Sequence, residues 1–185
     1  MIRVGCGYDS HRFQPPGPLI LGGIRIPFDN HLHGHSDGDA VCHALSDAIL
    51  GAAGLGDIGD MFSDQDPANK GRDSIDMLTA IVSRVQQMGF KVEQADVTII
   101  AESPRLTDHK EFMRTRLARA LGIAANDMNI KAKTNEGLGW IGRGEGIACV
   151  AVATKRCLSK IFRIPRRASA RASTIRSPSA RSAAP

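Results

Sequence analysis

The stretch from His35 to Gly54 reads HSDGDAVCHALSDAILGAAG and predicts the central helix of the fold. Its apolar residues recur at intervals of three and four, which is the period of one helical face. They are Ala40, Val41, Ala44, Leu45, Ala48, Ile49 and Ala52. Ser36 or Asp37 is a suitable N-cap, and Gly54 stands where a helix commonly ends. We therefore expect a helix from this cap to about Gly54.

The segments around this helix predict a sheet with further helices. Strands are expected at Ile2–Tyr8, at Leu19–Phe28 with a bulge or hairpin turn at Gly22-Gly23, and at Val92–Ala101, Met128–Thr134 and Ile147–Lys155. Helices are expected from Ser74 to Met88 and from Thr107 or Asp108 to Gly122, with a polar loop at 55–71 and a glycine-rich turn at 135–146. This order predicts an α/β (α+β) sandwich of ferredoxin-like type, with helices packed on one face of a mixed sheet.

Length and composition predict one domain. The chain has 185 residues, and we find no apolar run of eighteen or more and no leader-like start. We therefore expect no membrane partner. Only 4% of residues are aromatic, so we expect part of the apolar surface to be buried between subunits. Four widely spaced cysteines, with no CxxC motif, favour small core residues in a reducing, cytoplasmic compartment.

The net charge of +5 comes from the end of the chain. Residues 159–185 hold seven Lys/Arg and no acid, whereas residues 1–158 hold 17 basic and 19 acidic side chains. We expect a folded domain at 1–158 and a disordered Ala/Ser/Arg/Pro-rich tail at 159–185. The alternative is an arm that binds RNA or anionic lipid, but the tail has one aromatic residue to stack on bases, so no nucleic acid is expected as a partner.

Two glycine motifs match the dinucleotide-binding fingerprint in sequence but not in context. Residues 54–59 and 137–142 both match G-x-G-x-x-G. The dinucleotide fingerprint needs a strand before it and a helix after it. The first match follows a helix and the second leads into a strand, which excludes the Rossmann interpretation.

Asp9-Ser10-His11 and His43 form a candidate zinc site. A D-x-H motif in a strand places both side chains on one side of the chain, and three protein ligands leave a fourth position open for catalysis. One carboxylate and two imidazoles around zinc have a net charge of +1, which favours a phosphate oxygen. The alternative is a surface histidine at His11 and a core histidine at His43.

Polar residues near these ligands suggest supporting roles. Asp39, His43 and Asp47 share one helical face, so a carboxylate one turn away would hold the second ring nitrogen of His43, unless the three form a solvated stripe. His35-Ser36-Asp37 favours an anion at the helix start or only caps it. Glu136 follows a strand end and suits magnesium shared with substrate phosphates. Arg143 and Glu145 can equally form a surface ion pair.

Five motifs in order resemble the 2-C-methyl-D-erythritol 2,4-cyclodiphosphate synthase family over about residues 1–158. They are Gly7-Tyr8-Asp9-Ser10-His11, His35-Ser36-Asp37-Gly38-Asp39, Leu55-Gly56-Asp57-Ile58-Gly59, Asp64-Gln65-Asp66-Pro67 and Gly142-Arg143-Gly144-Glu145-Gly146-Ile147. The resemblance implies a homotrimeric lyase with active sites between subunits. Such an enzyme converts 4-diphosphocytidyl-2-C-methyl-D-erythritol 2-phosphate into the 2,4-cyclodiphosphate and CMP, in non-mevalonate isoprenoid (terpenoid) biosynthesis.

The resemblance also implies residue roles. Asp9, His11 and His43 would bind Zn²⁺, Glu136 would contact Mg²⁺ or Mn²⁺, and His35 and Thr134 would stabilise the transition state. Substrate contacts would be Asp9 and His11, the methylerythritol pocket of His35, Ser36, Asp57, Ile58, Gly59, Phe62, Asp64 and Asp66, and the cytidine and phosphate group of Ala101, Pro104, Arg105, Thr107, Ala132, Lys133, Thr134, Asn135, Glu136, Trp140 and Arg143. Tyr8, Arg143 and Glu145 would line an axial cavity that holds an isoprenoid diphosphate in relatives.

The chain departs from common family members at a few positions. Lys133 and Asn135 replace threonine, Trp140 replaces phenylalanine or tyrosine, and Glu102-Ser103-Pro104-Arg105 replaces Gln-Ala-Pro-Lys. A zinc-dependent phosphoester hydrolase is the enzymatic alternative. It would need a metal-bound water and a nearby base, and Glu136 does not lie in an H-E-x-x-H helix.

Overall fold

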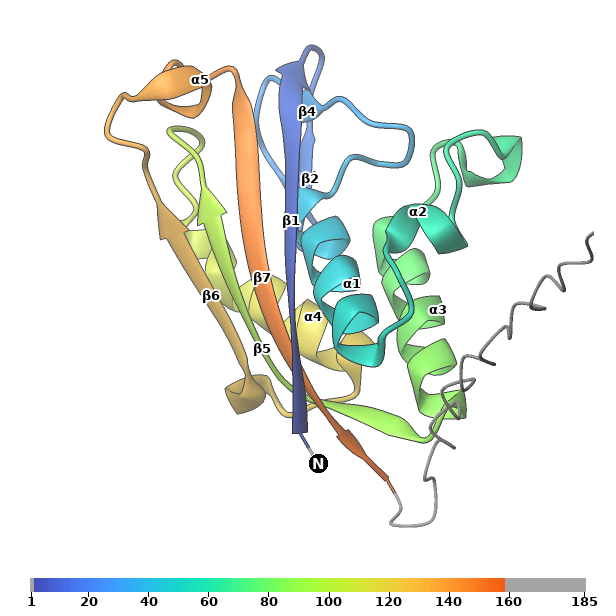
Figure 1. The fold of residues 1–185 in the computed structure, drawn as a ribbon. Coiled ribbons are helices and arrows are strands. Elements are labelled where there is room, and N and C mark those ends of the chain that lie inside the picture. The colour runs from blue at the N-terminus through green and yellow to red at the C-terminus, as the bar shows by residue number, and fades with distance from the viewer. Residues whose placement is uncertain (1, 159–185) are drawn as a thin grey trace, which may run out of the picture.

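The computed structural model describes residues 2–158, which form a sheet with helices on one face (Figure 1). The five-stranded sheet has the order β4-β1-β7-β5-β6, and β5 and β6 are its parallel pair. Its strands are β1 (Ile2–Gln14), β4 (His31–Leu32), β5 (Phe90–Ile100), β6 (Met128–Lys133) and β7 (Gly146–Cys157), while β2 (Leu19–Leu21) and β3 (Ile24–Ile26) form a separate hairpin. The predicted mixed sheet and its one-sided helical layer are confirmed. The predicted tail at 159–185 lies outside the described residues.

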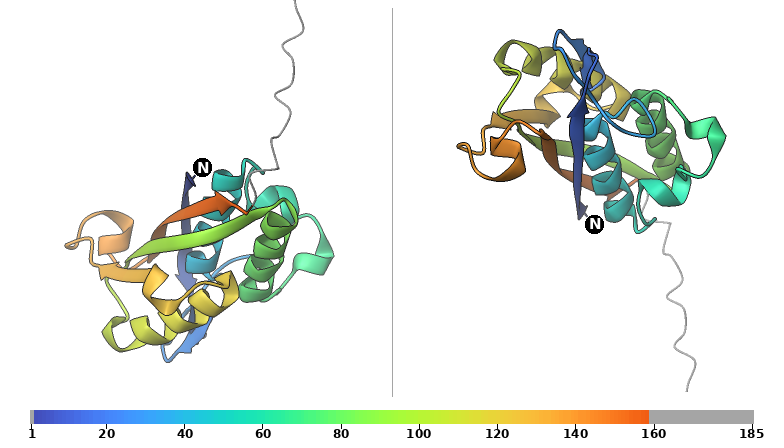
Figure 2. Two further views of the ribbon diagram at one scale, coloured as in Figure 1. Left: turned by 90° about the horizontal axis from the view of Figure 1, so that it is seen from below. Right: turned by 90° about the horizontal axis from the view of Figure 1, so that it is seen from above.

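Three longer helices and several short ones complete the fold. The longer ones are α1 (Ala40–Ala53), α3 (Ser74–Gln87) and α4 (Lys110–Leu121); the short ones are α2 (Ile58–Met61), α5 (Gly139–Gly142) and the 3₁₀ turns η1 (Pro67–Asn69), η2 (Thr107–His109) and η3 (Ala125–Asp127). The view from below shows α4 beside α3, and all views separate α5 from α2 across the molecule (Figure 2). None of the described helices is long and apolar enough to cross a membrane.

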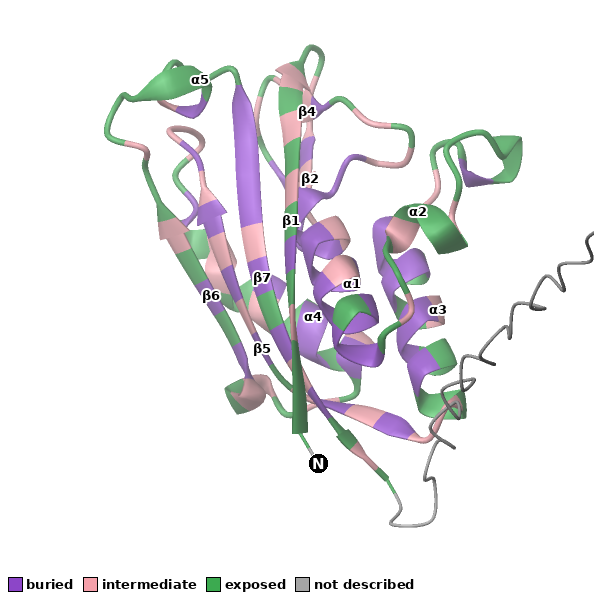
Figure 3. Ribbon diagram, viewed as in Figure 1, coloured by how far each residue is buried: buried purple, intermediate pink, exposed green. Residues whose placement is uncertain are grey.

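Close contact between β1 and α1 fixes the position of the central helix. A Cβ on Gly5 would lie 2.0 Å from the carbonyl oxygen of Ala48, and one on Gly7 would lie 2.0 Å from that of Ala44. Only glycine lets the strand backbone approach the helix backbone this closely. The helix is buried along most of its length, whereas residues of β1 alternate in exposure (Figure 3).

The start of α1 differs from the prediction. Its N-cap is Asp39, neither Ser36 nor Asp37, and the Asp39 carboxylate accepts hydrogen bonds from the backbone N–H groups of Val41 and Cys42. The same carboxylate accepts the N–H groups of Gly22 and Gly23, at 2.9 and 2.6 Å. Burial raises the pKa of Asp39. The β2–β3 hairpin thus fixes Asp39 as the N-cap through contacts that the local sequence around α1 does not reveal.

Other element boundaries also differ. β1 continues to Gln14 because its pairing with β7 runs on to Arg12, opposite Gly146, and Phe13 and Gln14 then pair with β4. The segment at 19–28 forms a hairpin, which is one of the two forms predicted for it, the other being a bulged strand. The polar loop at 55–71 contains α2 and η1, the turn at 135–146 contains α5, and the helix expected from 107 begins as a 3₁₀ turn without a side-chain cap.

The helix-free face of the sheet carries exposed apolar side chains. Ile2, Val4 and Tyr8 of β1 are 70%, 64% and 56% exposed, and Val152 of β7 is partly exposed. Cys42 and Cys149 are buried and Cys157 is half-buried. Cys6 is exposed on this face, so the expectation of a core position is wrong for that cysteine.

Candidate active site and metal centre

Three side chains from β1 and α1 converge on one point. Asp9 Oδ2 lies 2.9 Å from His11 Nε2 and 3.1 Å from His43 Nδ1, and the two imidazole nitrogens are 3.2 Å apart. Asp9 and His11 face the same way because they are two residues apart in a strand. His43 joins them because α1 lies directly against β1. The predicted set of three ligands is therefore assembled in one place.

Hydrogen bonds orient the ring of His11 toward this point. Its Nδ1 lies 2.8 Å from the carbonyl oxygen of His33. A carbonyl oxygen only accepts, so Nδ1 carries the proton and Nε2 presents a lone pair. Metal-bound histidines usually have this outer partner.

The ring of His43 is held by hydroxyl groups. Its Nε2 lies 2.9 Å from Ser36 Oγ and 3.0 Å from Ser74 Oγ. The expectation that Asp39 or Asp47 would hold this nitrogen is wrong: Asp39 caps α1, and Asp47 accepts the N–H of Ile58 at 2.8 Å. Ser74 was not among the predicted residues, because it is 31 residues from His43 in the chain and has no local motif to mark it.

The electrostatics and chemistry of the cluster suit a divalent cation. Burial alone would raise the pKa of Asp9, but hydrogen bonds and charge from His11 and His43 outweigh it, and this pKa lies well below its usual range. Burial opposes the charged form of His11, yet the Asp9 carboxylate raises the pKa of that imidazole. One carboxylate and two imidazoles are typical zinc ligands, and three of them leave a coordination position open.

The three ligands open into a pocket of about 180 Å³. Of the predicted residues, Asp9, His11, His35, Ser36, His43, Ile58, Phe62 and Asp64 line it, and they are joined by Asp47, Asn69 and Met77. Asp57 and Asp66 instead cap α2 and η1, where their carboxylates accept the N–H groups of Asp60 and Ala68. The pocket thus combines a metal centre, several acids and an apolar wall.

A second group of predicted residues lies where β5 and β6 end. Ala101 N–H donates to the Lys133 carbonyl at 2.9 Å, which joins the two segments. Thr134 Oγ1 donates to Glu136 Oε1 at 2.9 Å, and Glu136 has a positive φ of 51°. Trp140 lies in α5, and Arg143 pairs with Glu145 at 2.6 Å, as the ion-pair alternative expects.

Within one chain the two groups lie on different strands, and they meet where His11 and Trp140 line a common hollow of about 290 Å³ with Ser10, Arg12 and Glu145. β7 lies between β1, which carries Asp9 and His11, and β5, which leads to the second group. α2, beside the metal centre, and α5 stand on opposite sides of the molecule (Figures 1 and 2).

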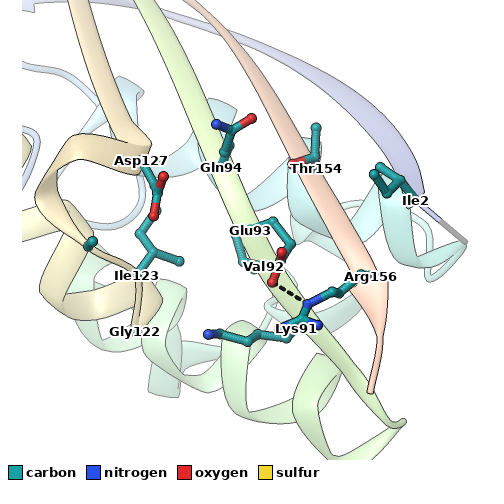
Figure 4. Close-up of a pocket in the computed structure, with 11 residues that line it drawn as sticks. Ile2, Lys91, Val92, Glu93, Gln94, Gly122, Ile123, Asp127, Thr154 and Arg156 are labelled. Carbon is teal, nitrogen blue, oxygen red and sulfur yellow. Dashed lines mark hydrogen bonds and ion pairs between the residues drawn. The ribbon is translucent and has the colours of Figure 1, made fainter. Parts of the chain in front are cut away.

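A larger hollow of about 470 Å³ lies elsewhere, at the end of the sheet where β1 begins. Figure 4 shows its polar lining, which includes Lys91 and the ion pair of Glu93 with Arg156 at 2.7 Å. It contains no convergent metal ligands among the described residues. Size alone does not make this hollow the reaction site.

The one-sided sandwich and the three-ligand centre open to a pocket define a metal-binding α/β enzyme. The chain belongs to the YgbB family, whose sequence model matches residues 2–156. Curated relatives named 2-C-methyl-D-erythritol 2,4-cyclodiphosphate synthase include that of Gemmatimonas aurantiaca, which is 58% identical over 83% of this chain and 93% of its own length. That of Escherichia coli is 53% identical over 82% of this chain and 96% of its own.

Solved structures agree in fold. The bifunctional IspDF of Campylobacter jejuni matches with a TM-score of 0.82 and 40% identity over 85% of this chain, which spans only 42% of that longer protein. A CDP-bound 2C-methyl-D-erythritol-2,4-cyclodiphosphate synthase matches with a TM-score of 0.77 and 36% identity, over 83% of this chain and 100% of its own. The CDP complex of Plasmodium falciparum IspF matches with a TM-score of 0.74 and 29% sequence identity, over 85% of this chain and 97% of its own length.

Proposed function

We propose that this chain cyclises 4-diphosphocytidyl-2-C-methyl-D-erythritol 2-phosphate to 2-C-methyl-D-erythritol 2,4-cyclodiphosphate and releases CMP. The observation that carries this proposal is the convergence of Asp9, His11 and His43 at the mouth of a pocket, in a chain whose relatives bear the synthase name. These names favour a synthase over the zinc-dependent hydrolase alternative. The proposed setting is the cytoplasm.

The reaction needs no protein base. An oxygen of the 2-phosphate attacks the β-phosphorus, and the bond from that phosphorus to the oxygen shared with the α-phosphate breaks. The electron pair leaves with CMP. A phosphate monoester has a second pKa of about 6, so the nucleophile is already largely dianionic at neutral pH. What the protein must overcome is repulsion between anions and the low probability of an in-line geometry.

The metal ions would be held by this chain's acids and imidazoles. Asp9, His11 and His43 would hold Zn²⁺, and Glu136 would contact Mg²⁺ or Mn²⁺. When bound, such ions neutralise phosphate charge and act as Lewis acids. His35 and Thr134 donate hydrogen bonds to the charge that develops on the phosphates.

The remaining predicted residues are proposed to bind the two ends of the substrate. Asp9 and His11, with His35, Ser36, Asp57, Ile58, Gly59, Phe62, Asp64 and Asp66, surround the methylerythritol phosphate. Ala101, Pro104, Arg105, Thr107, Ala132, Lys133, Thr134, Asn135, Glu136, Trp140 and Arg143 contact the cytidine and its phosphates. The positive charges of Arg105, Lys133 and Arg143 suit a diphosphate ligand.

A homotrimer would bring these two groups together. The apolar side chains on the helix-free face support such an assembly, because exposed apolar surface is commonly buried between subunits. In the trimer, the nucleotide group of one copy meets the metal centre of its neighbour. Tyr8, Arg143 and Glu145 then line the axial cavity proposed to take an isoprenoid diphosphate. Light scattering coupled to gel filtration tests the assembly, and a monomeric mass contradicts it.

Phosphorus NMR of the purified protein with substrate and Mg²⁺ tests the reaction directly. We expect a pair of cyclic diphosphate signals together with CMP, and their loss when a zinc chelator is added. Free phosphate or linear products would instead indicate the hydrolase. Cyclisation that continues without zinc would contradict the role of the metal centre.

A further inference from the structure

We propose that Ser74 and Asp37 form a positioning pair that fixes the direction of the hydrogen bond to His43, so that His43 Nδ1 offers its lone pair to the metal. The inference rests on the metal centre proposed above. It concerns two residues of the chain that touch no ligand atom of that centre. Their proposed role is exerted through the far side of the His43 ring.

The contacts of Ser74 define the direction. Its Oγ lies 3.0 Å from His43 Nε2, and its hydroxyl donates a hydrogen bond to Asp37 Oδ1. An ionised carboxylate only accepts, so the hydroxyl proton of Ser74 is committed to Asp37. Ser74 Oγ must then accept from His43, which places the ring proton on Nε2.

Asp37 is itself held in place. Its Oδ2 accepts the backbone N–H of Ser74 at 3.1 Å, and its Oδ1 accepts that of Asp39 at 3.2 Å. Ser74 is 1% exposed and is the first residue of α3. The pair therefore connects the start of α3 to the loop before α1, and it brings an acceptor to the ring of His43 from outside α1.

Ser36 also contacts His43 Nε2, but it does not fix which of the two atoms donates the hydrogen bond. Its Oγ lies 2.9 Å from His43 Nε2, 3.4 Å from Ser74 Oγ and 3.4 Å from the backbone nitrogen of Gly38. None of these contacts is with a carboxylate, so the Ser36 hydroxyl can turn to donate or to accept. Among the described residues, Ser74 is the hydroxyl at this nitrogen whose proton has an acidic partner.

Loss of the pair should weaken metal binding. With the Ser74 acceptor in place, Nδ1 is directed at Asp9 Oδ2 and His11 Nε2, where the metal would lie. Without it, the proton of His43 can move to Nδ1 and form a hydrogen bond with Asp9, which competes with the ion. Changes to such outer partners commonly reduce metal affinity by about 10- to 100-fold.

The test measures zinc affinity by competition with a fluorescent chelator. The proteins are the full chain and its Ser74→Ala, Asp37→Ala and double variants. Ser46→Ala is the matched control, because it removes the same atom from a buried serine of α1 whose hydroxyl has no hydrogen-bond partner among the described residues. We expect at least a tenfold loss for each single variant and less than a twofold change for the control. The zinc affinity of the double variant should stay within about threefold of that of the weaker-binding single variant, because the effects of two residues that act as one unit are not additive.

A second measurement uses the wild-type protein, so that a poorly folded variant does not decide the outcome. In zinc-loaded protein with ¹⁵N-labelled histidine, the Nε2–H signal of His43 should be present and slow to exchange, and it should exchange faster in Ser74→Ala. A wild-type His43 that carries its proton on Nδ1 overturns the proposal, as does a folded Ser74→Ala protein with unchanged zinc affinity. Failure of the wild type to bind zinc would overturn the metal centre as well, which distinguishes the two failures.

Discussion

The carboxylate of Glu102 holds the turn that carries Thr134 and Glu136. Its Oε1 accepts the backbone N–H groups of Asn135 at 2.8 Å and Gly137 at 3.2 Å. A carboxylate is an unfavourable charge beside a group proposed to bind nucleotide phosphates, whereas an amide oxygen accepts the same two bonds. The sequence showed glutamate at this position, but only the structure gives its partners.

We therefore expect Glu102→Gln to bind CMP a few-fold more tightly than the wild type, with stability changed by less than about 0.5 kcal/mol. Glu102→Ala should lose both hydrogen bonds and bind CMP more weakly. Titration calorimetry with CMP and urea unfolding measure the two effects. Equal weakening by the Gln and Ala variants would mean that the negative charge itself holds the turn.

Lys155 is a buried cation that lies over an aromatic ring. It is 2% exposed, its Nζ has no hydrogen-bond partner among the described residues, and it lies 2.9 Å from the centre of the Phe90 ring. Burial, followed by the charge of Arg3, lowers the pKa of Lys155 to about 8. In the unfolded chain this pKa is about 10.4, so the charged lysine costs stability below about pH 8. That cost fades as the pH rises from about 8 to 10.5.

Lys155→Met should accordingly raise the free energy of unfolding at pH 7 by on the order of 1 kcal/mol. The gain should shrink at pH 9.5, where the wild-type lysine is largely neutral in the folded state. Urea unfolding at both pH values provides the measurement. A gain that is the same at pH 7 and pH 9.5 would show that packing, and not charge, is the cause.

At the scale of elements, the contact of β1 with α1 couples the fold to the metal centre. The strand supplies Asp9 and His11, and the helix supplies His43. The distance between β1 and α1 is set by Gly5 and Gly7, which precede Asp9 in β1. An added methyl group at either glycine must therefore move the helix, and with it one of the three ligands.

We expect Gly7→Ala to lower the free energy of unfolding by about 1–3 kcal/mol or more, as overpacking does, and to weaken zinc binding. Gly51→Ala is the control, because a Cβ there meets no atom within 4 Å and alanine favours the helix. That variant should be neutral or more stable by about 0.4–1 kcal/mol. Thermal unfolding measures the stability of the two variants, and chelator competition measures their zinc affinity. Wild-type zinc affinity in a destabilised Gly7→Ala protein would show that the helix shift does not reach His43.

The elements that sequence predicts well are those with local causes. The period of α1, its end at Gly54 and the D-x-H pair of β1 all follow from residues within one turn or one strand. The cap at Asp39 and the Ser74 partner of His43 depend on segments 16–17 and 31 residues away. Long-range hydrogen bonds of this kind leave no spacing pattern, so the hydroxyl partner of His43 could not be predicted, whereas the convergence of Asp9, His11 and His43 could.

At the scale of the whole molecule, the proposed homotrimer predicts complementation between subunits. His43→Ala disables the metal centre of a copy, and Glu136→Gln disables the nucleotide group. In a mixed trimer, a Glu136→Gln copy can supply an intact metal centre to a neighbouring His43→Ala copy whose nucleotide group is intact. Each single variant should lose most turnover, whereas every mixed trimer should regain one working site of its three.

The experiment co-expresses the two variants with different affinity tags, purifies the mixed assemblies over both tags and follows CMP release. Mixing the two separately purified homotrimers, without exchange of subunits, is the control and should stay inactive. Recovery only in the co-assembled sample would mean that each site takes residues from two copies, as the proposed homotrimer requires. Mixed trimers that remain inactive would place both groups in one subunit and would contradict the proposed assembly.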